Sequence, residues 1–230
     1  LVGLALASGA GALPAQREEG VAAYRAGDYA AADAAFDAAY QRTGDRRLLR
    51  ARGNCRFRLG DFARARLCYE RARLGSPRDP ELLANLRLVR RALELPAASA
   101  GFGADLREQL DRASAWERAW LGGAAMTLAA ALLVFGWRRA GLRWLGAFCL
   151  LPGLGLAVDG VWLEPNKPRT AVALEELQVT AEPRVGMAAV ATVRPGALLA
   201  LRGGADGSFV RVEAGGRVGY APRAAVGVVE

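Results

Sequence analysis

Two runs without charged residues, 119–137 and 144–158, lie near the middle of this 230-residue chain. All five tryptophans lie at or near the ends of these runs: Trp116, Trp120, Trp137, Trp144 and Trp162. At about 1.5 Å of rise per residue the first run covers roughly the 30 Å hydrocarbon core of a bilayer, and indole rings favour the headgroup level. The pattern therefore predicts a transmembrane hairpin with spans at 119–137 and 144–163.

The connecting segment 138–143 predicts the orientation of this hairpin. It contains Arg138, Arg139 and Arg143 and no acidic residue, and short arginine-rich loops stay in the cytoplasm. Both flanking parts are then extracytoplasmic, so we expect an inner (cytoplasmic) membrane protein with its N- and C-terminal domains in the periplasm. Asp159 lies in the second span, either as an acid at the outer headgroup level or as the partner of a base on another membrane subunit.

Residues 1–15 read LVGLALASGAGALPA, without any charge and with many small side chains. The segment resembles the end of a secretory signal peptide. A third membrane helix is the competing interpretation, for which fifteen residues are short. Export of the segment that follows agrees with the orientation predicted from the arginine loop.

The formal net charge is +8, and the chain contains no histidine. The absence of histidine removes the usual general base, the commonest metal ligand and the serine or cysteine triads that depend on imidazole. We expect no enzymatic activity, no catalytic residue, no cofactor and no metal. The positive charge favours anionic lipid headgroups or an acidic protein partner. Nucleic acid is not an expected partner of an exported domain.

An internal repeat with a period of 33 residues occupies the first soluble segment. Residues 20–39 read GVAAYRAGDYAAADAAFDAA, and residues 53–72 read GNCRFRLGDFARARLCYERA. This is the pattern of the tetratricopeptide repeat (TPR), in which small residues let two antiparallel helices approach, a Gly-Asp pair forms the turn and an aromatic ring fills the space beneath. The residues with these structural roles are Gly20, Gly27, Ala32, Phe36, Gly53, Gly60, Ala65 and Tyr69, and Pro77 closes the second repeat.

We assign residues 16–96 to the TPR repeats with a capping helix from Pro80, and 97–118 to a linker and juxtamembrane helix. The first helices of such a stack line a concave groove, where the residues predicted to bind a partner are Arg17, Tyr24, Arg25, Arg50, Asn54, Phe57 and Arg58. Arg50 and Asn54 stand four apart on one helical face, which resembles half of a carboxylate clamp. The alternative is an ordinary solvated arginine face.

Cys55 and Cys68 lie equally far along the chain from the turn at 60–62, and therefore at about the same level of the second hairpin. Two interpretations stay open. In an oxidising compartment the two residues form a disulfide. Otherwise they are two small buried thiols at positions that alanine would also fill.

After a polar linker at 164–169, the segment 170–230 changes to short β runs separated by glycine and proline. The predicted strands are 170–174, 177–181, 189–193, 197–202, 209–213, 218–221 and 225–229. The glycine hairpin and final strands resemble the bacterial SH3 domain, a small all-β barrel, with Phe209, Gly219 and Tyr220 either in its core or on its ligand face. By that resemblance a cell-wall peptide or glycan is a conceivable ligand.

The expected fold is thus a multi-domain membrane protein with α-helical TPR hairpins, a two-helix transmembrane hairpin and a C-terminal SH3-like barrel. This order of parts resembles the TPR subunit of the aerotolerance (Bat) operons, often called the BatE type. The resemblance implies a non-catalytic scaffold that works with Bat proteins carrying von Willebrand factor A domains and with a MoxR-type ATPase in envelope stress tolerance. The alternative is a peptidoglycan-binding envelope protein that acts through its SH3-like domain.

Overall fold

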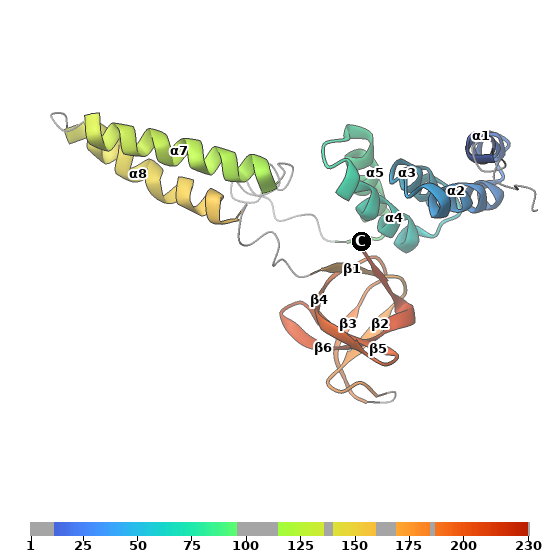
Figure 1. The fold of residues 1–230 in the computed structure, drawn as a ribbon. Helices are drawn as coiled ribbons and strands as arrows, with labels where there is room; N and C mark the ends of the chain where they lie inside the picture. The colour runs from blue at the N-terminus through green and yellow to red at the C-terminus, as the bar shows by residue number, and fades with distance from the viewer. Residues whose placement is uncertain (1–11, 96–114, 136–139, 160–168, 185–186, 230) are drawn as a thin grey trace, which may run out of the picture. The chain divides into compact units, whose positions relative to one another are not determined.

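The computed structural model describes residues 12–95, 115–135, 140–159, 169–184 and 187–229. Within these ranges it contains seven α-helices and seven β-strands (Figure 1). They form two compact units: one combines Leu1–Ala97 with Pro168–Glu230, and the other is the intervening Ala98–Lys167. Most of the predicted signal segment, the linkers and Arg138 and Arg139 of the predicted loop lie outside the described residues.

Five helices form the N-terminal part of the first unit: α1 (Ala12–Arg25), α2 (Tyr29–Thr43), α3 (Arg47–Arg58), α4 (Phe62–Gly75) and α5 (Pro80–Ala92). The two sequence repeats become two helix pairs, α1 with α2 and α3 with α4. In each pair a glycine with positive φ turns the chain, Gly27 at 83° and Gly60 at 78°. The aspartate that follows each glycine accepts a hydrogen bond from the first turn of the next helix, which satisfies an otherwise unpaired backbone N–H.

Glycine is required where the paired helices cross. A Cβ added to Gly20 would lie 2.7 Å from Cε1 of Phe36, and one added to Gly53 would overlap the ring of Tyr69. Both rings are almost fully buried. The missing side chain in the first helix therefore makes the space that the aromatic ring of the second helix fills.

The C-terminal part of the first unit is a seven-stranded antiparallel sheet in the order β3-β2-β6-β5-β4-β1-β7. The strands are β1 (Thr170–Ala173), β2 (Leu177–Thr180), β3 (Ala189–Val193), β4 (Leu198–Asp206), β5 (Phe209–Ala214), β6 (Arg217–Pro222) and β7 (Val226–Val228). The sheet is strongly curled (Figure 1). Alternating apolar side chains of its strands fill the inside. The first and last residues of each observed strand lie within two residues of those predicted, with one exception. Strand β4 ends at Asp206, four residues beyond its predicted end.

The second unit consists of α7 (Ala115–Phe135) and α8 (Ala140–Val158), which pack against each other. A Cβ on Gly122 would lie 2.5 Å from the backbone nitrogen of Ala157 and 2.7 Å from the oxygen of Gly153, so the two backbones are in close contact. Among the described residues one helix stretch, Trp116–Val134, is long and apolar enough to cross a membrane. The apolar part of α8, Ala147–Val158, is shorter, so only one of the two predicted spans meets that criterion.

Candidate functional site

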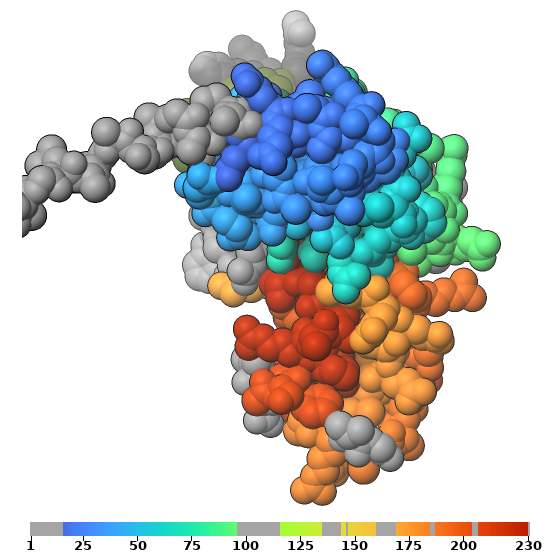
Figure 2. Space-filling view, turned by 90° about the vertical axis from the view of Figure 1, so that its right-hand side faces the viewer, coloured from blue at the N-terminus to red at the C-terminus, as the bar shows by residue number. Residues whose placement is uncertain are grey.

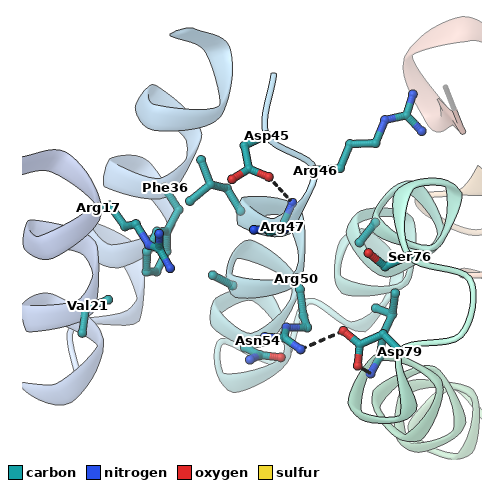
Figure 3. Close-up of a pocket in the computed structure, with 14 residues that line it drawn as sticks. Arg17, Val21, Phe36, Asp45, Arg46, Arg47, Arg50, Asn54, Ser76 and Asp79 are labelled. Atoms are coloured by element: carbon teal, nitrogen blue, oxygen red, sulfur yellow. Dashed lines mark hydrogen bonds and ion pairs between the residues drawn. The ribbon is translucent and has the colours of Figure 1, made fainter. Parts of the chain in front are cut away.

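A groove with a volume of about 370 Å³ opens between α1, α3 and α5, the first helix of each pair and the helix that follows them. Arg17 comes from α1, Arg50 from α3 and Asp79 from the position before α5, and the buried ring of Phe36 on α2 also lines the groove (Figure 3). The remaining lining residues are Val21, Asp45, Arg46, Arg47, Leu48, Ala51, Asn54, Ala72, Ser76 and Leu82. This site combines an apolar floor with a charged rim, an arrangement suited to an extended chain with polar side chains.

Arg50 is already paired within the chain. Its Nη1 lies 2.8 Å from Oδ2 of Asp79 and 2.9 Å from Oε2 of Glu81. Asp79 also caps α5, because its Oδ1 accepts hydrogen bonds from the backbone N–H groups of Glu81 and Leu82. The guanidinium predicted to hold a partner's carboxylate therefore holds α3 to α5 instead.

Asn54, the second half of the predicted clamp, is fixed by two hydrogen bonds. Its Oδ1 accepts one from the hydroxyl of Tyr69 at 2.8 Å and one from Nδ2 of Asn85 at 3.0 Å. The acceptor end of the amide is thus occupied inside the stack, and its NH2 end is the side left to donate. Asn54 and Arg50 both line the groove, but they do not form a vacant pair for one carboxylate.

Three further arginines give the groove its charge. Within the described part of the chain, the guanidinium groups of Arg17, Arg46 and Arg47 form no ion pair. Asp45, which also lines the groove, accepts a hydrogen bond at 2.9 Å from the backbone N–H of Arg47, the first residue of α3. Because Asp79 is taken by Arg50, the groove keeps an excess of positive charge that complements an acidic partner.

The other predicted groove residues lie elsewhere. Arg25 joins Arg17 at a second, more open hollow of about 500 Å³ along α1. Tyr24, Phe57 and Arg58 are not among the residues that line the groove.

These three residues lie beside the turns between the paired helices, where Tyr24 and Arg58 form a cluster with Tyr29, and Phe57 packs against Phe62. The rings of Tyr24 and Tyr29 are 5.2 Å apart, as are those of Phe57 and Phe62. The guanidinium of Arg58 lies 5.8 Å from the centre of the Tyr29 ring. A hydrogen bond to Tyr24 raises the pKa of Arg58 and thereby favours the charged form of its guanidinium.

Sequence reasoning missed the residues that decide the electrostatics of the groove: Asp45, Arg46, Arg47, Asp79 and Glu81. A local signal existed for one of them, because an aspartate directly before a proline that opens a helix is typical of an N-cap. No local signal links Asp79 to Arg50, which precedes it by 29 residues.

Cys55 and Cys68 are buried free thiols in the structure. Burial raises the pKa of both thiols, for Cys55 to about 11. Such thiols stay protonated near neutral pH and are poor nucleophiles. The described residues contain no cluster of acidic or cysteine side chains arranged to hold a metal ion.

The three sheet residues predicted as core or ligand face lie on β5 and β6. Phe209 and Tyr220 are half-buried on neighbouring strands β5 and β6. Gly219 packs so closely against β2 that an added Cβ would lie 2.6 Å from the carbonyl oxygen of Thr180. Gly219 therefore serves the packing of the sheet.

Comparison with known proteins assigns no family to this chain. No protein-family model matches the sequence, and no curated protein matches it closely enough to count as a relative. The conclusions about function therefore depend on the groove, the charges around it and the apolar helices.

Proposed function

We propose that this protein is a non-catalytic, membrane-anchored scaffold whose groove between α1, α3 and α5 binds an acidic segment of a partner protein. The observation that carries the proposal is the set of arginines around the groove. Arg17, Arg46 and Arg47 line it above an apolar floor and form no internal ion pair among the described residues, although the guanidinium of Arg46 points away from Arg17 and Arg50 (Figure 3). An extended chain with carboxylates would gain charge-assisted hydrogen bonds there.

The helix pairs α1–α2 and α3–α4 are TPR hairpins in this proposal. Three features support it: the 33-residue period, the matching glycine turns, and the fit of one aromatic ring against one glycine in each pair. Stacked helix pairs of this kind offer an elongated concave surface that suits a peptide segment. The curled C-terminal sheet is an SH3-like domain by the same proposal.

The second unit anchors the protein, with α7 and α8 crossing the membrane as a hairpin. Large apolar side chains of both helices are exposed: Trp116, Trp120, Leu121, Leu128, Val134, Trp144, Leu145, Phe148, Leu151, Leu154 and Val158. Two helices alone cannot cover so much apolar surface in water, and lipid tails cover it without cost. α7 contains the longer apolar stretch, Trp116–Val134, and α8 contributes the shorter one, Ala147–Val158.

The order of these parts resembles the Bat aerotolerance proteins, and the location and partners proposed follow from that resemblance. The helical and sheet parts lie on the periplasmic side of the inner membrane. Proteins with von Willebrand factor A domains, served by a MoxR-type ATPase, supply the partner segment. Lipid is the second partner, through α7 and α8.

Affinity purification in mild detergent with mass spectrometry tests the groove. The test variant is Arg17→Glu with Arg47→Glu, which reverses two groove charges. An acidic residue in the first turn of α3 agrees with the helix dipole, so loss of binding cannot be attributed to a weakened helix. The matched control is Arg87→Glu, an exposed position on α5 that does not line the groove.

Partners retained by the wild type and by the control, but depleted at least tenfold in the double variant, support the proposal. An unchanged set of partners in all three proteins contradicts it. Co-sedimentation of all three with purified peptidoglycan, without any dependence on the groove charges, would instead favour the cell-wall-binding alternative.

A further inference from the structure

Helix α4 buries two faces within the first unit. Its residues 65, 69 and 72 belong to the core of the helix pairs. Arg66, Leu67 and Glu70 are also buried, although they lie on a different side of the helix. Positions three and four apart share a helical face, so a second element has to cover this side.

The element that covers it is the C-terminal sheet. Nη1 of Arg66 donates a hydrogen bond of 2.6 Å to the carbonyl oxygen of Gly196, in the turn between β3 and β4. The Arg66 side chain is only 7% exposed, and its burial lowers the pKa of Arg66 despite the nearby Glu70. Burying a guanidinium is costly unless its donors are satisfied. The Gly196 carbonyl accepts a hydrogen bond from one of these donors, so contact with the sheet offsets part of the cost of burying Arg66.

Glycines of the sheet provide the space for the helices. A Cβ on Gly227 in β7 would overlap the side chain of Leu67, and one on Gly196 would overlap that of Leu93. Nε of Arg71 donates a hydrogen bond of 2.9 Å to the carbonyl oxygen of Val228. Because β7 is an edge strand, this arginine satisfies a backbone group that would otherwise face solvent or a foreign strand.

We propose that α4 is a docking surface for the C-terminal sheet of the same chain, so that residues 12–95 and 169–229 act as one body. Figure 2 shows the helical residues, blue to green, directly against the orange and red strands. The sheet is then a fixed part of the groove-bearing body. Its edge at β7 and its turn at Pro195 and Gly196 are not available to an external ligand.

This docking constrains the path of the chain through a membrane. The second unit is inserted between two segments of one body, so it has to leave that body and return to it on the same side. If α7 crosses, an even number of crossings is needed, and α8 is the described helix able to return the chain. This step rests on the membrane anchoring proposed above, whereas the docking itself does not.

A disulfide trap tests the docking in the full-length protein. The pair Leu67→Cys and Gly227→Cys is introduced with Cys55, Cys68 and Cys149 replaced by alanine, and the control pair is Leu67→Cys with Val218→Cys on the exposed part of β6. After mild oxidation, mass spectrometry of proteolytic peptides measures the linked fraction. We expect at least tenfold more cross-link for the first pair. Equal yields for the two pairs would overturn the docking.

Adding Arg66→Ala to the first pair distinguishes a specific contact from chance proximity. We expect the cross-linked fraction to fall several-fold, while circular dichroism shows that the helical content is retained. An undiminished yield would show that Arg66 does not hold the sheet, and would overturn its assigned role.

Labelling from one side of the membrane tests the even number of crossings. Single cysteines at Leu59, on the helical part, and at Val218, on the sheet, are exposed to a membrane-impermeant maleimide in sealed vesicles of one orientation. We expect both positions to be labelled from the same side. Labelling from opposite sides would overturn the inference. Neither the cross-linking nor the labelling depends on the groove. If the groove variants lost no partners, the results expected for these two experiments would stay the same.

Discussion

Arg118 on α7 and Asp159 at the end of α8 form an ion pair, with 2.8 Å between Nε and Oδ2. The Arg118 side chain is 3% exposed and that of Asp159 is 33% exposed. The sequence left open whether Asp159 is an interfacial acid or the partner of a base on another subunit. The structure pairs it with a base of the same chain, at the end of the α7–α8 hairpin where Gly122 also meets Ala157.

Separating this pair should destabilise the second unit. Asp159→Ala leaves a buried arginine without this carboxylate, which we expect to cost about 1–3 kcal/mol, less than a fully buried pair because Asp159 is partly exposed. Thermal denaturation in mild detergent measures the loss. The swapped variant, Arg118→Asp with Asp159→Arg, should recover part of it, whereas a swapped variant as unstable as Asp159→Ala would contradict a direct ion pair.

Asp33 holds the two helix pairs together across the α2–α3 contact. Its Oδ1 lies 3.1 Å from Nε of Arg52, and its Oδ2 lies 2.5 Å from Nη2 of Arg56. Burial alone would lower the pKa of Arg56, but the hydrogen bond and charge of Asp33 outweigh it and raise that pKa.

Asp33→Ala should therefore reduce the free energy of unfolding by about 3 kcal/mol, because two arginines lose a buried partner. Asp37→Ala serves as the control, since Asp37 also pairs with Arg52 but its side chain is 40% exposed. We expect it to cost about 0.5 kcal/mol. Urea unfolding followed by circular dichroism compares the two variants, and equal losses would show that burial of the pair does not matter.

Gly53→Ala should destabilise the second helix pair by about 1–3 kcal/mol, because the new methyl group overlaps the buried ring of Tyr69. The second variant, Gly53→Ala with Tyr69→Leu, removes the ring atoms that clash. The loss in thermal midpoint of this double variant should be smaller than the sum of the losses measured for Gly53→Ala and for Tyr69→Leu alone. Simple additivity in this comparison would mean that the methyl group and the ring do not collide.

The stability of the helical part should fall above about pH 9. Burial, aided by the charge of Asp33, raises the pKa of Cys55 from 9.0 to about 11. The unfolded chain therefore loses this proton first, and stability that is present below pH 9 is lost as the pH rises to about 11. At pH 10 this amounts to about 1 kcal/mol.

Cys55→Ala isolates that contribution. Relative to the wild type, its free energy of unfolding should improve by about 1 kcal/mol between pH 8 and pH 10. Cys149→Ala, on α8, controls for the general effect of removing a thiol. A constant difference between Cys55→Ala and wild type across this range would refute the predicted linkage.

The features that the sequence predicted correctly are local ones, which depend on residues close together in the chain. The 33-residue period placed two helix pairs, and the Gly-Asp turns placed their boundaries at Gly27 and Gly60, because a turn with positive φ and a side-chain cap are properties of a few neighbouring residues. Period-two patterning between glycine and proline breaks placed the strands for the same reason. The bounds of the two helices of the second unit agreed less well with the predicted spans: α7 begins at Ala115 rather than 119, and α8 begins at Ala140, within the predicted loop.

The lining of the groove differs from the predicted partner-binding set in its charge pairing. Arg50 and Asn54 face it as the helical spacing requires, yet neither is a vacant ligand for a carboxylate. Tyr24, Phe57 and Arg58 share that spacing and still lie at the turns. The register of one helix against the next decides which of its turns reaches the groove, and that register is set by packing between residues far apart in sequence.

The sequence by itself determined which segments are helices, strands and apolar spans, because hydrophobic period, glycine and capping residues act over one or two turns of chain. Only the tertiary structure decided which charges meet. Arg50 pairs with Asp79, Arg118 with Asp159, and Arg66 binds the carbonyl of Gly196, which lies 130 residues away. Such partners depend on three-dimensional packing, since a charge interacts with whatever the folded chain brings within a few ångströms.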